Sequence, residues 1–96
     1  MASEEIKRYR VIISGRVQGV AFRYYTVEMA GRLGITGWVR NVYPRDVEAV
    51  VEGKSPEIGK MIAFLRQGPP AAHVMDIHIV EEPYAPGEFS DFSIRF

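Results

Sequence analysis

The 96-residue chain has the length and composition of one compact domain. Hydrophobic residues make up 47% and charged residues 25% of the sequence, the balance of a soluble globular protein. The absence of cysteine excludes disulfides, thiolate metal sites and a cysteine nucleophile. Twelve basic and twelve acidic residues give a net charge of zero, so no overall charge attracts the chain to nucleic acid or to an anionic membrane.

The distribution of charge and apolar residues along the chain is more informative. Residues 1–5 are polar and acidic, with no apolar run behind them long enough for a signal peptide or a membrane span, so we expect a cytoplasmic protein. Residues 7–23 carry five basic residues and no acid, whereas residues 76–91 carry five acids. The N-terminal third is therefore the better candidate for an anion site. Without repeats or linkers, residues 1–96 are expected to form a single domain.

The first third of the chain predicts a strand followed by a helix. Residues 6–14 are rich in β-forming side chains, and their alternation places Tyr9, Val11 and Ile13 on one face. Apolar residues then recur at three- and four-residue spacing, which predicts a helix over 22–33. The apolar face of this helix would consist of Phe22, Tyr25, Met29, Ala30 and Leu33.

The middle of the chain predicts a hairpin and a second helix. Residues 35–42 and 46–52 are typical of two strands joined across a Tyr-Pro-Arg turn. Ser55, followed by a proline and an acid, is a helix-start signal because serine can cap free backbone amides. The apolar stripe of this helix would be Ile58, Met61, Ile62 and Leu65.

Two more strands complete the expected fold. They cover residues 74–80, with Met75, Ile77 and Ile79 on one face, and residues 89–96. The resulting order, β-α-β-β-α-β with an additional C-terminal strand, predicts an α+β fold, the ferredoxin-like sandwich. Both helices would cover one face of an antiparallel or mixed sheet whose central strands are the first and the third, and the other sheet face would stay partly exposed.

The loop between the first strand and the first helix is the candidate anion site. Gly15 and Gly19 permit positive φ, so successive amides of residues 14–23 can point inward, and the helix start adds a partial positive charge. Arg23 would present a planar fork of donors that matches phosphate oxygens. A tight turn beside a solvated arginine explains the same spacing equally well. The loop lacks the Walker lysine-plus-hydroxyl ending, and the chain lacks cysteine, so water is the remaining nucleophile.

Two motifs closely resemble the paired signature of the acylphosphatase family. They are Gly15-Arg16-Val17-Gln18-Gly19-Val20-Ala21-Phe22-Arg23 and Gly34-Ile35-Thr36-Gly37-Trp38-Val39-Arg40-Asn41. The resemblance extends over nearly the whole chain, including Gly68-Pro69-Pro70-Ala71-Ala72 and the ending over residues 89–96.

This resemblance implies metal-independent, cofactor-free hydrolysis of acyl phosphates to carboxylate and inorganic phosphate. It implies that Arg23 and Asn41 are catalytic, because Arg23 holds the phosphate and Asn41 orients the attacking water. The implied phosphate-binding residues are Gly15, Arg16, Val17, Gln18, Gly19, Val20, Ala21 and Arg23. The expected partners are a small acyl phosphate and inorganic phosphate, without nucleic acid or membrane, and the expected state is a monomer.

Some features have plainer interpretations. Apart from the resemblance, Asn41 is a strand-end residue that would bond to its own hairpin backbone. His73 and His78 lack a metal-ligand spacing, and Trp38 is expected to pack in the core. The turn after Asn41, which includes Pro44, departs from the family's usual Asp-Gly turn and leaves the preference among acyl groups open.

Two other functions are compatible with this order of elements. An RNA-binding sheet is the first, but residues 46–52 are acidic and lack the aromatic residues of such a sheet. The second is an acylphosphatase-like unit inside an assembly, as the resemblance to domains of hydrogenase maturation carbamoyltransferases allows. A free chain of 96 residues favours the enzyme.

Overall fold

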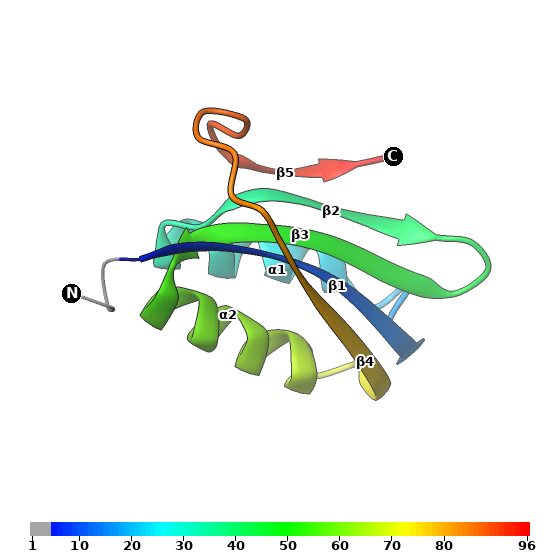
Figure 1. Cartoon of the computed structure of the whole chain (residues 1–96). Coiled ribbons are helices and arrows are strands. Elements are labelled where there is room, and N and C mark those ends of the chain that lie inside the picture. The colour runs from blue at the N-terminus through cyan, green and yellow to red at the C-terminus, as the bar shows by residue number, and fades with distance from the viewer. Residues whose placement is uncertain (1–4) are drawn as a thin grey trace.

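Two helices cover one face of a five-stranded sheet in the computed structural model, which describes residues 5–96 (Figure 1). The elements in chain order are β1 (Ile6–Arg16), α1 (Phe22–Leu33), β2 (Thr36–Val42), β3 (Asp46–Lys54), α2 (Ser55–Gln67), β4 (His73–Glu82) and β5 (Phe92–Arg95). The strands lie in the order β4-β1-β3-β2-β5. Neighbouring strands are antiparallel except β2 and β5, which are parallel. The predicted ferredoxin-like fold, with β1 and β3 inside the sheet, is confirmed.

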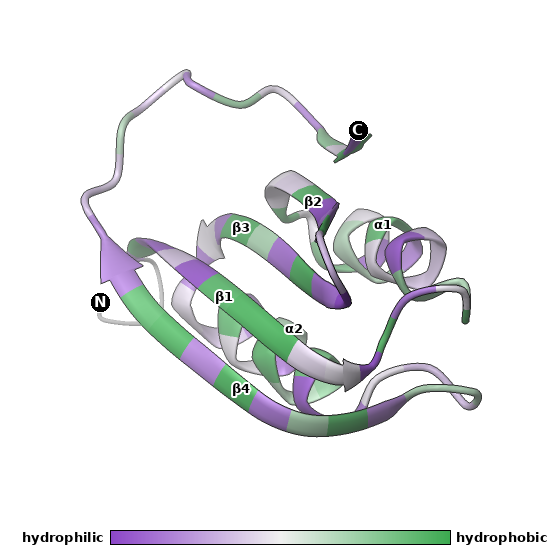
Figure 2. Cartoon of the chain, turned by 90° about the vertical axis from the view of Figure 1, so that its right-hand side faces the viewer, coloured by the Kyte–Doolittle hydropathy of each residue, from purple (hydrophilic) through white to green (hydrophobic). Residues whose placement is uncertain are grey.

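The hydrophobic core lies between the sheet and the two helices. Alternate residues of β1 and β3 face the helices, as the period of two predicts. The alternation is also visible along β4, where hydrophobic and hydrophilic residues follow one another (Figure 2). The buried core residues are Val11, Ile13, Val17, Phe22, Ala30, Ile35, Val39, Val47, Ala49, Val51, Ile58, Met61 and Leu65.

The buried stripe of α1 differs from the predicted one at Tyr25. This side chain is 38% exposed, and the buried residues of the helix are Phe22, Thr26 and Ala30. Their spacing of four residues gives a narrower stripe than the apolar pattern indicated. Thr26 is tolerated inside because its hydroxyl donates to the backbone oxygen of Phe22 at 2.8 Å.

Two further local predictions were wrong. Met75 is 75% exposed because β1 and β4 change register at a bulge: Ser14 pairs with Asp76 and Gly15 with Val74, which leaves Met75 unpaired. Ser55 does not cap α2. Lys54 is the residue at that position, and no side chain caps the helix.

β3 is followed directly by α2, with no loop between them. The backbone amide of Ser55 donates to the backbone oxygen of Glu5 at 2.9 Å, so the residue before β1 satisfies one of the first amides of the helix. The last strand is also shorter than predicted, because residues 83–91 form a connection that crosses the sheet from β4 to β5 (Figure 1).

The sheet face opposite the helices carries ion pairs in place of an apolar layer. Arg8 and Glu52 form a buried pair at 2.8 Å between β1 and β3. Arg10 and Arg40, on the strands at either side of β3, both pair with Glu48. The crossing connection adds to this layer, since Glu88 pairs with Arg8 at 2.9 Å.

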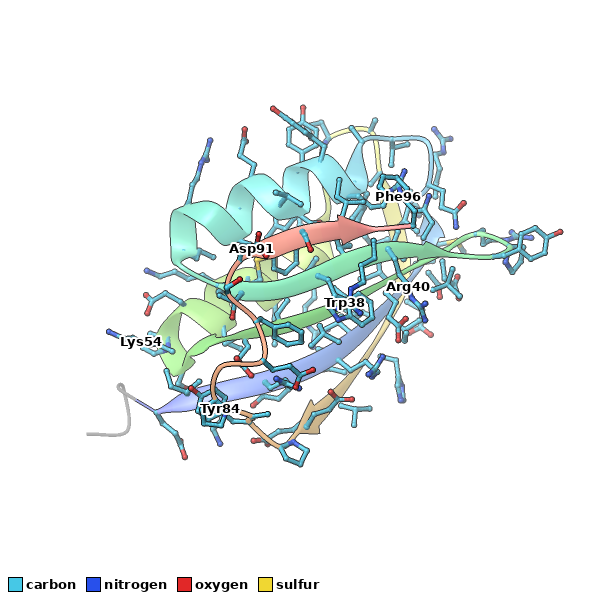
Figure 3. All side chains as sticks on the ribbon, turned by 90° about the horizontal axis from the view of Figure 1, so that it is seen from above. Trp38, Arg40, Lys54, Tyr84, Asp91 and Phe96 are labelled. Carbon is cyan, nitrogen blue, oxygen red and sulfur yellow. The ribbon has the colours of Figure 1, made fainter. Side chains whose placement is uncertain are left out.

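Trp38 also belongs to this opposite face, not to the core where it was predicted. The indole is buried, with 7% of the residue exposed, and three guanidinium groups lie within 6 Å of its ring (Figure 3). They are those of Arg10 at 5.8 Å, Arg40 at 5.4 Å and Arg95 at 4.7 Å. The Trp38 ring is therefore covered by positively charged arginine side chains that make cation–π contacts with it.

Candidate active site

The loop predicted to bind an anion is shorter in the structure than in the sequence-based prediction. Gly15 and Arg16 are the last residues of β1 and pair with Val74 and His73 of β4. The connection to α1 is therefore formed by residues 17–21 alone. The bulge that displaces Met75 allows β1 to continue pairing this far and brings the loop close to the start of α1.

The two glycines of the motif have separate reasons for being glycine. Gly15 has φ +129°, and a Cβ at this position would lie 2.2 Å from the backbone oxygen of His73, so the β4 backbone occupies the space of a side chain. Gly19 has φ +73°, and a Cβ added there would meet no atom within 4 Å. Glycine at position 15 therefore allows β1 to lie close to β4. At position 19 glycine is favoured only because the loop backbone is left-handed there.

The start of α1 leaves its amides without a side-chain cap. Ala21, the residue before the helix, has φ +59° and makes no capping hydrogen bond. A left-handed alanine costs about 1 kcal/mol or more, and it is the only non-glycine residue with positive φ in the described part of the chain. The first amides of the helix are consequently available to an anion, which the positive end of the helix dipole also favours.

A cavity of about 170 Å³ lies at this helix start. It brings together the two residues predicted to be catalytic, Arg23 from the first turn of α1 and Asn41 from the end of β2. At about 30 Å³ for one water molecule in the liquid, the space is of the order of a small anion with its hydration. The lining residues are Val17, Gly19, Ala21, Phe22, Arg23, Tyr24, Asn41 and Ile94.

Gln18 fixes the loop relative to the hairpin that carries Asn41. Its side-chain nitrogen donates to the backbone oxygen of Val42 at 3.2 Å and to that of Asp46 at 2.9 Å. These two carbonyls belong to the facing ends of β2 and β3. Sequence reasoning placed Gln18 in the loop for its backbone amide and missed this side-chain role, which no local pattern indicates.

Arg23 differs in its surroundings from the arginines of the sheet. Arg8, Arg10 and Arg40 all pair with glutamates. Within residues 5–96 no carboxylate pairs with Arg23, whose guanidinium carbon lies 5.5 Å from the centre of the Phe96 ring. The positive charge of Arg23 is therefore left for an external anion.

The remaining predicted residues do not line the cavity. Gly15, Arg16, Gln18 and Val20 are not among its lining residues, nor is Pro44, whose preceding peptide bond is cis. Sequence reasoning missed Tyr24 and Ile94, which do line the cavity. The spacing of apolar residues assigns both to ordinary secondary structure, so it gives no sign of their place at the site.

The described chain has neither a metal-binding cluster nor a membrane-spanning helix. Over residues 5–96, no three His, Cys, Asp or Glu side chains gather in a group that could hold a metal ion. Neither helix of the described chain is long and apolar enough to cross a bilayer.

Known proteins resemble this chain over nearly its full length. The acylphosphatase family model matches residues 9–94. An acylphosphatase of Syntrophus aciditrophicus is 47% identical over 91 residues, covering 95% of this chain and 94% of the relative. The crystal structure of acylphosphatase from Bacillus subtilis has a TM-score of 0.88 at 34% identity, covering 96% of this chain and 100% of that one. Full-length HypF, in its phosphate- and nucleotide-bound form, is similar at a TM-score of 0.82 and 26% identity, but over 12% of its own chain. The chain therefore belongs to the acylphosphatase family.

Proposed function

We propose that this chain is an acylphosphatase in which Arg23 binds the phosphate of an acyl phosphate and Asn41 positions the water that attacks it. The observation that carries the proposal is the cavity that joins the uncapped start of α1, the unpaired charge of Arg23 and the amide of Asn41 within the described part of the chain. Membership of the family supports the same reaction.

The phosphate end of the substrate would lie against the loop and the start of α1. The backbone amides of residues 17–21 and the guanidinium of Arg23 are donors that can neutralise the phosphate oxygens. Because they are held in place before the substrate arrives, they stabilise charge in the transition state without reorganising. Gln18 keeps this donor set at a fixed distance from Asn41.

The chemical step is an in-line displacement at phosphorus. The water oxygen held by the Asn41 amide forms a bond to phosphorus while the bond from phosphorus to the acyl oxygen breaks, and the carboxylate leaves with the electron pair. The leaving carboxylate is weakly basic and needs no proton from the protein. None of the described residues that line the cavity is a carboxylate or an imidazole, so the proton of the attacking water passes to a phosphate oxygen.

The division of roles between Arg23 and Asn41 predicts different kinetic effects. We expect Arg23→Ala to lose both turnover of acetyl phosphate and affinity for inorganic phosphate. Asn41→Ala should lower kcat by roughly 10²- to 10³-fold, as for the removal of one positioned donor, with the inhibition constant of inorganic phosphate nearly unchanged. The assay contains excess EDTA, which should not reduce the rate of the wild-type enzyme.

The control is Arg66→Ala, which removes an exposed arginine from the last turn of α2, outside the cavity. It should keep both turnover and phosphate inhibition. Equal losses of phosphate affinity in the Arg23 and Asn41 variants would contradict the proposed division. Absence of turnover by the folded wild-type chain would contradict the enzymatic function itself.

The state and location of the protein belong to the same proposal. We infer that residues 1–96 act as one monomeric domain in the cytoplasm, with an acyl phosphate and inorganic phosphate as the only ligands. The RNA-binding alternative is less compatible with the open sheet face, where Glu48 and Glu52 take up the charge of neighbouring arginines. Light scattering after size-exclusion chromatography measures the oligomeric state directly.

A further inference from the structure

A cluster of arginines surrounds Trp38 on the sheet face opposite the helices. Arg40 of β2 and Arg95 of β5 are in-register neighbours on the two parallel strands, and both are exposed. Their guanidinium carbons lie 5.4 and 4.7 Å from the centre of the Trp38 ring. Figure 3 shows Trp38 and Arg40 near each other on this face. Because neighbouring strands are only about 4.8 Å apart, the fold holds two positive charges next to each other, an unfavourable arrangement without an anion.

The carboxylates of this face do not neutralise the cluster. Glu48 accepts a hydrogen bond from the Nε atom of Arg40 at 2.7 Å, and it also pairs with Arg10. Glu82 binds Arg10 as well, at 2.7 Å. Within the described chain no carboxylate pairs with Arg95, and no hydrogen bond uses the outer nitrogens of Arg40. Three arginines therefore share two carboxylates, and one positive charge has no counter-ion.

Contact with the indole leaves the hydrogen-bond donors of these two arginines available. A cation–π contact involves the charge of the guanidinium and the face of the ring, so the N–H groups can still donate in the guanidinium plane. Phosphate oxygens match this planar fork of donors. Two exposed forks side by side, with one charge left over, have the composition of a site for a phosphate dianion.

We propose that Arg40 and Arg95 form a second anion site, which binds a free phosphate dianion. The site is separate from the cavity, because Arg40 and Asn41 are consecutive residues of β2 and point to opposite faces of the sheet. The ligand is a small anion, because the carboxylates of Glu82 and Glu88 lie on the same face and would repel an extended polyanion. The inference does not depend on the proposed hydrolysis.

The test uses Trp38, the only tryptophan of the chain, as a probe within the proposed site. Sodium phosphate should change the Trp38 fluorescence in a saturable way, whereas sodium chloride at equal ionic strength should not. Arg95→Gln removes a charge and a fork, and it should weaken the apparent affinity for phosphate by roughly tenfold, as expected for one charge-assisted contact. Arg95→Lys keeps the charge without the fork and should weaken the affinity less.

Two controls separate this site from other arginines. Arg66→Gln removes an exposed arginine from the last turn of α2 and should retain the wild-type affinity. Arg23→Ala removes the arginine of the cavity and should retain the same fluorescence titration. Arg95→Gln should also hydrolyse acetyl phosphate at the wild-type rate, because the two sites lie on opposite faces of the sheet. Circular dichroism of each variant verifies that the fold is intact.

Each outcome decides for or against the second site. A saturable change that is weaker in Arg95→Gln but retained in Arg23→Ala and Arg66→Gln supports it. Wild-type affinity in both Arg95 variants would refute it, as would an equal response to sodium chloride, which indicates charge screening alone. A response that disappears in Arg23→Ala would assign the phosphate to the cavity. A response to oligodeoxythymidylate but not to inorganic phosphate would identify a nucleic-acid backbone as the ligand and overturn the proposal.

Discussion

Gly15 and Gly19 show how two residues of one motif can act by different physical means. The β4 backbone occupies the position of a Gly15 side chain, whereas the space at Gly19 is open. Gly15 therefore contributes to the cavity indirectly, by allowing β1 to pair until the loop begins. Gly19 lies in the cavity lining itself, where its positive φ shapes the loop backbone.

Alanine at each position should separate stability from activity. We expect Gly15→Ala to lower the free energy of unfolding by about 3 kcal/mol or more, because a strained φ and a collision with backbone add together. Gly19→Ala should cost about 1 kcal/mol from its left-handed φ alone, yet reduce kcat/KM because the loop amides shift. Urea unfolding and acetyl phosphate hydrolysis measure the two effects. A larger stability loss in the Gly19 variant would contradict this account.

The charge state of Glu48 affects the stability of the folded protein. Its burial alone would raise the pKa of the carboxyl, but hydrogen bonds from Arg10 and Arg40 outweigh burial, so the pKa is lowered. A lowered carboxyl pKa stabilises the folded state above the unfolded value of about 4.3, and this contribution is lost as the pH falls through the folded pKa.

Glu48→Gln should therefore destabilise the protein in a pH-dependent way. At pH 7 we expect a loss of about 2–3 kcal/mol, less than the roughly 3–5 kcal/mol of a fully buried pair because both arginines are partly exposed. The difference between wild type and variant should shrink as the pH falls below about 4. Urea unfolding at pH 7 and pH 3 measures it, and a difference independent of pH would rule out the charge as its cause.

Among the elements, the loop and the hairpin depend on each other through Gln18. The loop carries the amides proposed to bind phosphate, the hairpin carries Asn41, and the two hydrogen bonds from the Gln18 amide join them. Their relative position, more than the identity of either segment, decides whether water lies in line with the leaving group.

Gln18→Ala tests this connection. Loss of two hydrogen bonds should reduce stability by about 1–2 kcal/mol, while misplacement of the loop should lower kcat more than it weakens phosphate inhibition. Gln18→Glu removes the donor with little change in size and should act similarly. If kcat in both variants equals that of the wild type, Gln18 has no positioning role.

Local sequence patterns predicted the helices and strands well, but they did not predict the residues that depart from the regular pattern of burial. The alternation of β1 and β3 and the three- and four-residue spacing in α2 predicted the buried faces, because each depends on neighbouring residues alone. Met75 was assigned to the wrong face because a bulge arises from pairing with β1, which no pattern within β4 shows. Trp38 was assigned to the core because its sequence neighbours do not reveal the three arginines that surround it.

The proposed catalytic pair could be predicted from the sequence, whereas the place of Ile94 at the cavity could not. Arg23 and Asn41 were predicted from motifs, and the structure brings both to one cavity. Ile94 reaches the cavity only because β5 returns beside β2. Contacts made by a long return of the chain lie outside what a single sequence can show without its fold.

For the whole molecule, the connection over residues 83–91 ties the two edges of the sheet together. Glu88 pairs with Arg8, and the Arg8 guanidinium lies 4.6 Å from the centre of the Phe89 ring. The connection thus covers the buried pair of Arg8 and Glu52 and leads into β5, which carries Ile94 to the cavity.

Phe89→Ala should reveal this link between the open face and the site. We expect a loss of stability of about 1–2 kcal/mol from the missing ring contact and burial, together with a lower kcat/KM although Phe89 is outside the cavity. Tyr43→Ala, which removes a ring that is 93% exposed, is the control for stability and should change it little. Differential scanning calorimetry and acetyl phosphate hydrolysis measure the two effects, and an unchanged kcat/KM would disprove the link.

The strand order has a consequence for biosynthesis. The first strand made, β1, lies between β3 and β4, and the last strand, β5, completes the cavity that the loop after β1 begins. A nascent chain therefore carries the proposed phosphate-binding loop long before the cavity is complete. Pairing between such distant segments is typical of domains that fold in milliseconds to seconds. Catalytic competence should appear only after β5 has emerged from the ribosome.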